Sequence, residues 1–188
     1  MATDVSICSN GLFMIGADEI NSFEDETREA RICAALYPTT RDELLQSHPW
    51  SFTFQQIVLA RTVDTPLEDY KYEYQIPPGT LRIVRKNELR NDYRIYQDKL
   101  FSDAPAVTII RQVDPGEASY PAHFVRLLEY GMAEVLGASI SQDETITRLF
   151  ANRKNEQMRK SRGIDSQNSP NRKFDASQLR LTAVRVDG

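Results

Sequence analysis

The sequence predicts an α+β fold in which helices from both ends of the chain form one bundle packed with an antiparallel β-meander, followed by an extended C-terminal arm. Apolar residues recur at helical spacing in the first 47 residues and again after residue 120, whereas they alternate with a period of two between residues 51 and 113. The links between the alternating segments are too short for parallel crossovers, so these strands are expected to be antiparallel.

Three helices are expected in the first quarter of the chain, over residues 4–15, 23–37 and 40–47. Cys8 and Leu12 share one face of the first helix. A capping box that starts at Ser22 predicts the beginning of the second helix, and Pro38 predicts its end. The third helix is expected to stop before Pro49.

Four or five strands are expected within residues 51–113. Trp50 and Phe52 lie where the helices give way to the sheet, and we expect them in the hydrophobic core; the alternative is a surface on which bases or sugars stack. Tyr70, Tyr72 and Tyr74 alternate along one strand. This ladder predicts a half-buried strand face, and only an exposed aromatic stripe would indicate a subunit interface.

Two long helices, over residues 120–140 and 143–160, follow the sheet. Leu128 and Leu149 belong to their apolar stripes and are expected in the core. After Phe150 the second helix loses its stripe, so its last turns are expected to project from the body. The sequence therefore predicts a body over residues 1–162.

The charge of the chain changes sign near its end. Residues 148–188 carry a net charge of +6, which leaves −10 for residues 1–147 of a chain whose net charge is −4. A basic helix begins this segment and is expected to contact a neighbouring subunit or another partner. Its basic side chains are Arg148, Arg153, Lys154, Arg159, Lys160 and Arg162.

Residues 163–188 are expected to form a flexible docking arm. They begin as a polar stretch with too little apolar surface to fold alone. Leu179, Leu181 and Ala183 then alternate with Arg180, Thr182 and Val184, which is typical of one short strand that lacks a partner nearby in the sequence. Such a segment is suited to folding on another protein.

The sequence contains few motifs that are typical of catalysis, cofactor binding or metal binding. It contains no phosphate-binding loop, no dinucleotide-binding glycine pattern and no nucleophile elbow. Cys8 and Cys33 are expected to be buried small hydrophobes, with a disulfide as the lesser alternative. The acidic cluster between Asp18 and Glu29 suits a helix N-terminus better than a hydrolytic or metal site, and His48 and His123 lack partners for a metal site. We expect no enzyme activity, cofactor or metal.

No apolar run is long enough to span a membrane, and no export signal is evident, so a cytoplasmic origin is expected.

Several short motifs together resemble the tail tubular protein A family, the head-to-tail adaptors of short-tailed bacteriophages. The resemblance covers about residues 10 to 150. The elements that carry it, in order, are Asn10, Ile15-Gly16 and Ile20; Ala30 and Tyr37; Arg41 with Leu44-Leu45; Pro49-Trp50-Ser51-Phe52; and Tyr74-Gln75-Ile76-Pro77.

The resemblance implies a structural virion protein of the phage tail or neck, assembled in the host cytoplasm. Members form a ring, commonly of twelve copies, between the portal protein and the tail nozzle protein, and the ring surrounds the channel through which genomic DNA is ejected. DNA would pass without sequence-specific binding.

The resemblance also implies that the C-terminal segment engages the portal. Its residues expected to do so are Arg172, Lys173, Phe174, Leu179, Arg180, Leu181, Val184 and Arg185. No family motif matches this segment, so the individual contacts stay open. Two other functions remain as alternatives: nucleic-acid binding by the basic helix over residues 148–162, and, with the least support, a tail-associated hydrolase.

Overall fold

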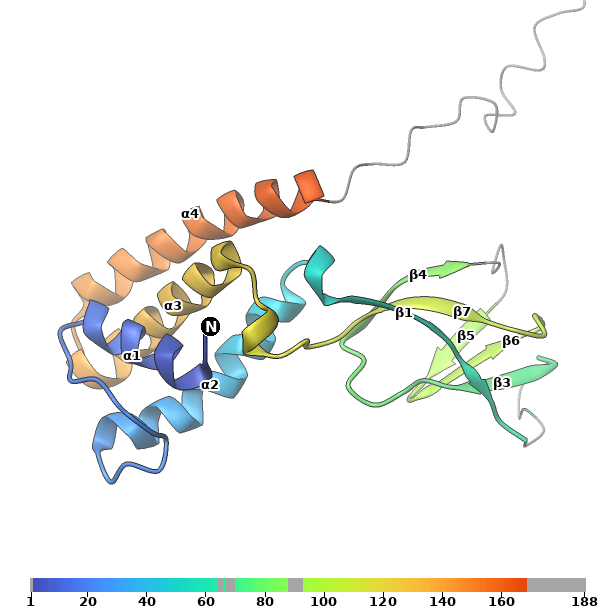
Figure 1. Cartoon of the computed structure of the whole chain (residues 1–188), viewed down its shortest axis with the longest axis horizontal. Helices are drawn as coiled ribbons and strands as arrows, with labels where there is room; N and C mark the ends of the chain where they lie inside the picture. Colours follow the sequence, from blue (N-terminus) through green and yellow to red (C-terminus); the bar gives the residue numbers. More distant parts are fainter. Residues whose placement is uncertain (1, 64–65, 67–69, 88–92, 169–188) are drawn as a thin grey trace, which may run out of the picture.

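The computed structural model describes residues 2–63, 66, 70–87 and 93–168. The chain is an α+β protein: within the described residues, four α-helices form a bundle on one side and seven short strands lie on the other (Figure 1). Two segments cross between the two parts: η1 (Ser51–Thr53) with β1 (Phe54–Val58), and the return from β7 (Thr108–Gln112) to η2 (Glu117–Ser119). None of the described helices has both the length and the apolarity that crossing a membrane requires.

The bundle contains α1 (Asp4–Met14), α2 (Arg28–Gln46), α3 (Ala122–Leu136) and α4 (Glu144–Asn168). As the apolar periodicity predicts, helices from both ends of the chain share one core, which is centred on α3. Trp50 and Leu128 are fully buried there, and Phe52 packs against the core at its edge. Gly131 permits the close approach of α2 to α3, because a Cβ atom at this position would lie 3.1 Å from Leu44 Cδ1.

The prediction of two helices over residues 23–37 and 40–47 is wrong, because α2 is one continuous helix that contains Pro38. Proline removes one main-chain donor but does not force a break when tertiary packing holds both halves. Tyr37 and Leu44 are buried on either side of it. The helix also starts later than the capping box indicates: Thr27 caps it, whereas Ser22 belongs to a turn closed by Asp25.

The helices after the sheet have other bounds than the predicted 120–140 and 143–160. Pro121 precedes the first residue of α3, and a π-helical turn, η3 (Gly137–Ser141), ends it. Asp143 caps α4 by accepting hydrogen bonds from the N–H groups of Thr145 and Ile146. Because α4 continues to Asn168, the predicted boundary between body and arm at residues 162 and 163 is wrong.

The placement of two parts of α4 also corrects the sequence-based prediction. Leu149 is 46% exposed and is not a core residue, because Ile146 and Phe150 occupy the face that meets the bundle. The last turns of α4 do not project from the body. Ser161 and Asp165 are buried, so the inward stripe continues with polar residues that an apolar pattern does not reveal.

The strands form two sheets instead of one meander. Sheet A has the order β1-β7-β4, with β4 over Arg82–Asn87. Sheet B has the order β2-β3-β6-β5, and its strands are β2 (Ala60–Arg61), β3 (Tyr72–Gln75), β5 (Tyr93–Tyr96) and β6 (Lys99–Ser102). The chain changes sheets at Leu59, between β1 and β2. The five strand pairs that the described residues form are antiparallel, as expected.

A second, smaller core lies within the strands and includes Leu59, Tyr74, Leu100 and Ile109. Tyr74 is 1% exposed, so the tyrosine ladder belongs to a strand face covered by the chain itself and is not an exposed stripe. Glu73, on the opposite face of β3, is also buried, and its carboxylate lies 2.7 Å from Lys99 Nζ. Alternation alone would place Glu73 in solvent.

Candidate functional site

The C-terminal end of α2 is the point at which the helical bundle meets sheet A. The last carbonyl groups of a helix lack partners within the helix and must find donors elsewhere. Here the Nε1–H of Trp50 donates to Leu44 O, at 2.9 Å, and the amide of Gln112 in β7 donates to Leu45 O, at 2.6 Å. Gln112 is fully buried, so it attaches sheet A to the helix end.

Two arginines complete this cap. Arg82 of β4 donates to Gln46 O at 3.0 Å, and Arg162 of α4 donates to Ser47 O at 3.1 Å. Cations at a helix C-terminus are favoured by the helix dipole. The carbonyl groups at the end of α2 therefore receive hydrogen bonds from Trp50, which follows the helix, from strands β7 and β4 of sheet A, and from α4. We call this junction, residues 44–53 with 112–116, the hinge.

Asp165 of α4 fixes the other side of the hinge. Its carboxylate accepts hydrogen bonds from the N–H of Ser51 at 3.0 Å and from the Ser51 hydroxyl at 2.7 Å, and it lies 3.6 Å from His48 Nε2. Serine, histidine and aspartate meet here, but both Ser51 and His48 contact the carboxylate. The hydroxyl donates to Asp165 and not to the histidine, so the arrangement lacks the serine–histidine contact of a hydrolytic triad. It joins α4 to the hinge.

The return crossing is held by charged and phenolic groups around Arg41 of α2. Arg41 lies 3.4 Å from a carboxylate oxygen of Asp114 and 3.6 Å from one of Glu117. Tyr120 donates to Asp114 at 2.7 Å, and Tyr37 donates to Glu117 at 3.0 Å. Burial, together with these carboxylates, raises the pKa of both phenols, so they remain donors at all ordinary pH values.

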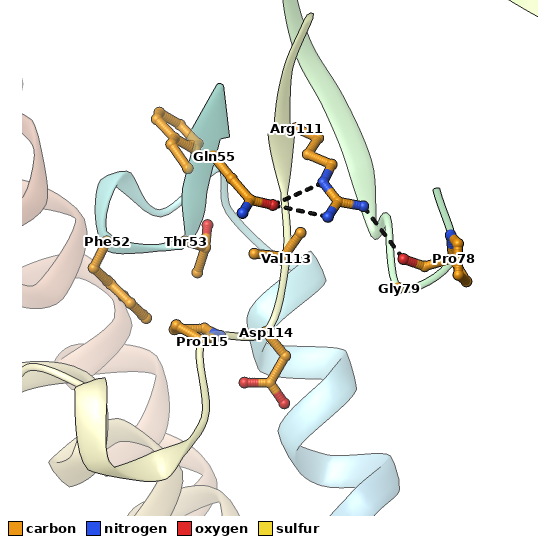
Figure 2. A pocket seen from close by; sticks show the side chains of 10 residues that line it. Phe52, Thr53, Gln55, Pro78, Gly79, Arg111, Val113, Asp114 and Pro115 are labelled. Atoms are coloured by element: carbon orange, nitrogen blue, oxygen red, sulfur yellow. Dashed lines mark hydrogen bonds between the residues drawn. The ribbon is translucent and has the colours of Figure 1, made fainter. Parts of the chain in front are cut away.

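An open pocket of about 530 Å³ lies beside the hinge, where the bundle meets the sheets (Figure 2). Phe52 and Gln55 line it on one side, Pro78 on the other, and Arg111 and Val113 of the return segment lie between them. The guanidinium of Arg111 donates to Gln55 Oε1, Pro78 O and Thr80 Oγ1. These bonds tie the two walls together, so the pocket is formed before anything binds.

The basic side chains predicted as an interaction surface do lie on one helix, but each makes a contact within the chain. Ion pairs join Arg148 to Glu144, Lys154 to Glu134, and Lys160 to Glu156. Arg153 lies over the Phe150 ring, Arg159 donates to Asn155 O, and Arg162 caps α2. With six basic and three acidic side chains, α4 has a net charge of +3.

The remaining candidate residues are placed as follows. Cys8 and Cys33 are both buried free cysteines, as expected for small core residues. Most of the acidic side chains between Asp18 and Glu29 are exposed around the start of α2. Among the described residues, no group of three or more histidine, cysteine or carboxylate side chains could hold a metal ion. The predicted portal-binding residues, from Arg172 to Arg185, lie outside the described residues.

Asp165, Gln112 and Arg111 are the residues of this site that the sequence did not reveal. Asp165 lies in the stretch predicted as an arm, and its partner Ser51 is 114 residues away. The only signal was the aromatic cluster His-Pro-Trp-Ser-Phe, which marked one side of the hinge. No family model and no curated protein matches the chain.

We predict that acidification weakens the hinge. Burial lowers the pKa of His48, an effect that Arg162 and Arg82 increase and Asp165 opposes, and burial likewise lowers the pKa of His123. A histidine whose pKa is lower in the folded state is protonated first in the unfolded chain, so stability falls as the pH drops below about 6.5. The free energy of unfolding, measured in urea between about pH 7 and pH 5, should therefore decrease.

The matched control is the double variant His48→Gln, His123→Gln. Its free energy of unfolding should decrease less over the same pH range, because neither position can take up a proton. An equally steep decrease in the double variant would show that the histidines do not cause the effect.

Proposed function

We propose that this chain is a head-to-tail adaptor: a structural virion protein that forms a ring between a portal and a tail nozzle and surrounds the DNA exit channel. The proposal starts from the motifs between Asn10 and Pro77 that resemble such adaptors. The structural observation that supports it best is the hinge. An adaptor must transmit a fixed geometry between two different partners, and the hinge holds two dissimilar parts at a set orientation.

The distribution of charge is consistent with a ring. A closed head-to-tail ring needs two different, complementary patches on each subunit. The acidic side chains at the start of α2 and the net charge of +3 that remains on α4 provide opposite charges on one helical bundle. An acidic body also suits a DNA channel, because it does not bind the phosphates that pass it.

The C-terminal segment completes the proposal as the part that engages the portal. Asp165 fixes the end of α4 at the hinge, and 20 residues follow Asn168. At about 3.3 Å per residue, these could extend by up to roughly 66 Å. Leu179, Arg180 and Leu181 lie 11 to 13 residues beyond Asn168, so at about 3.3 Å per residue they could reach roughly 36 to 43 Å from the end of α4 to a neighbouring protein.

Nucleic-acid binding by α4 is the alternative. All six of its basic side chains already make contacts within the chain, which leaves fewer of them to neutralise phosphates and lowers the expected affinity. No observation favours a hydrolase.

A mass measurement of the purified chain, alone and mixed with portal, tests the proposal. A ring of twelve 21.5 kDa chains would have a mass of about 258 kDa. We expect a ring of that order, formed either by the chain alone or on addition of portal. The proposal would be overturned if the chain stayed monomeric and did not bind portal. Steeply salt-dependent binding to duplex DNA in the same sample would favour the alternative.

A further inference from the structure

Strand β1 is an edge of sheet A, and its outer side carries main-chain groups that have no hydrogen-bond partner among the described residues. On its inner side, Leu59 N donates to Val107 O at 2.9 Å, so the odd-numbered residues along this strand bond to β7. By the alternation of an antiparallel ladder, the N–H and C=O groups of Gln56 and Val58 point away from β7. A further strand could bond to them.

The edge strands of the two described sheets are β1, β4, β2 and β5, and they differ in how they are protected. Strands β2, β4 and β5 each contain arginine, and the pairing of β4 with β7 is also interrupted by a bulge. Strand β1 reads Phe-Gln-Gln-Ile-Val, with no charge, no proline and no bulge. Natural proteins usually guard an edge with such features, because an unguarded edge pairs with another strand. Among the described edges, β1 is therefore the one suited to pairing.

The solvent-exposed face of β1 also carries apolar side chains. Val58 is 70% exposed and Phe54 is 37% exposed, and Gln56 lies between them on the same face. Ile57 and Leu59 belong to the opposite face, which packs into the smaller core of the strands. A strand added beside β1 would cover apolar surface without disturbing that core.

We infer that the free chain forms a two-fold dimer in which β1 pairs antiparallel with β1 of a second copy. Pairing centred on Gln56 places Phe54 of each copy opposite Val58 of the other. These positions are even-numbered, so the register uses the groups that point away from β7 and leaves the ladder with β7 intact. Aromatic and β-branched residues form favourable cross-strand pairs.

The main-chain groups of β1 fit this register. Gln56 N would donate to Gln56 O of the other copy, and Val58 N would donate to Phe54 O of the other copy. The two-fold axis repeats each bond. Phe54 N takes no part, because it already donates to Ser51 O at the end of η1. The strand therefore offers a second copy both donors and acceptors at matching positions.

A second copy is the partner because the strand complements itself and the other described edges carry arginine. The chain has a net charge of −4, so two copies repel least where they meet through a neutral strand. The helical bundle adjoins the start of β1 (Figure 1). Because the paired strands would run antiparallel, the two bundles would lie at opposite ends of the joined sheet.

The inference does not depend on the proposed function. A two-fold contact uses the same surface on both copies and closes on itself, so it cannot extend into a head-to-tail ring. In an adaptor, the dimer would be the form that exists before portal is added, and it would separate when the ring assembles.

Sedimentation equilibrium of the full chain tests the inference. The contact is one strand wide, so we expect a weak dimer of twice 21.5 kDa, about 43 kDa, with a dissociation constant on the order of 10 to 100 μM. Val58→Lys introduces a guarding charge and should weaken the dimer at least about tenfold. Val63→Lys is the matched control, because Val63 is fully exposed outside the strands, and it should dimerise like the wild type.

The register is tested by exchanging the apolar pair for an ion pair. Phe54→Glu alone should weaken the dimer, because the carboxylate would face Val58 of the other copy. Combined with Val58→Lys it should strengthen the dimer again, because each lysine then faces a glutamate of the other copy. Within one chain the two positions are four residues apart along a strand, about 13 Å, so the new charges cannot pair there.

Residue-resolved amide hydrogen exchange locates the contact. The Gln56 and Val58 amides should exchange more slowly as the chain concentration rises through the dissociation constant, while the Ile57 amide, which bonds to β7, should not change. A wild-type chain that stays monomeric at about 1 mM would overturn the inference. A dimer that Val58→Lys does not weaken, or a double variant that pairs no better than the single variants, would also overturn it. A ring formed by the chain alone would overturn it while supporting the adaptor proposal, so the two failures are distinguishable.

Discussion

Replacing Trp50 with alanine is expected to lower the free energy of unfolding by about 3 to 5 kcal/mol, the usual range for deleting a large buried aromatic side chain. Trp50 belongs to the hinge and is fully buried in the core of the bundle. Its ring meets Phe124 edge to face at 5.3 Å between centroids and His48 at 4.8 Å. The substitution would leave a cavity and remove the donor to Leu44 O, so packing and hydrogen bonding are lost together.

Urea denaturation of the wild-type and variant chains measures this loss. The variant Phe13→Ala is the matched control, because Phe13 is a large aromatic residue that is 81% exposed. Its free energy of unfolding should change by no more than about 0.5 kcal/mol. Equal denaturation midpoints for the wild type and the Trp50→Ala variant would show that the hinge does not depend on this residue.

Deleting residues 174–188 is expected to abolish attachment to portal-bearing capsids. The deletion removes Leu179 and Leu181, each of which would contribute about 1.5 to 3 kcal/mol if buried on the portal. Loss of both corresponds to at least about a hundredfold weaker binding. The described body ends at Asn168, so the deletion leaves its contacts intact.

Co-sedimentation with portal-bearing capsids measures the attachment, and the far-UV circular dichroism spectrum should confirm that the helices are retained. A chain in which glycine and serine replace residues 174–188 is the control for length. It should also fail to attach. Wild-type affinity of the truncated chain would place the portal contact on the helical bundle.

The sequence predicted what depends on short-range periodicity. Spacings of three and four residues placed helices at both ends of the chain, and a period of two placed the strands between them. The aromatic cluster at Trp50 marked the boundary between the two parts. These features follow from neighbours within one or two turns, so a local pattern contains them.

The candidate site was largely hidden because its contacts join distant parts of the chain. Gln112 reaches Leu45 across 67 residues, and Asp165 reaches Ser51 across 114. A polar residue that is buried through such a partner looks like a solvent-exposed one in the sequence. For this reason the last turns of α4 were predicted to project, although Ser161 and Asp165 are buried.

The sequence by itself determined the α+β class, the joint bundle of the terminal helices and the central position of Trp50. The tertiary structure alone decided that α2 continues through Pro38, that the chain changes sheets at Leu59, and that α4 extends to Asn168. In each of these cases packing or hydrogen bonds to distant residues outweigh a local conformational preference of about 1 to 3 kcal/mol. A pattern of neighbouring residues contains no information about those distant contacts.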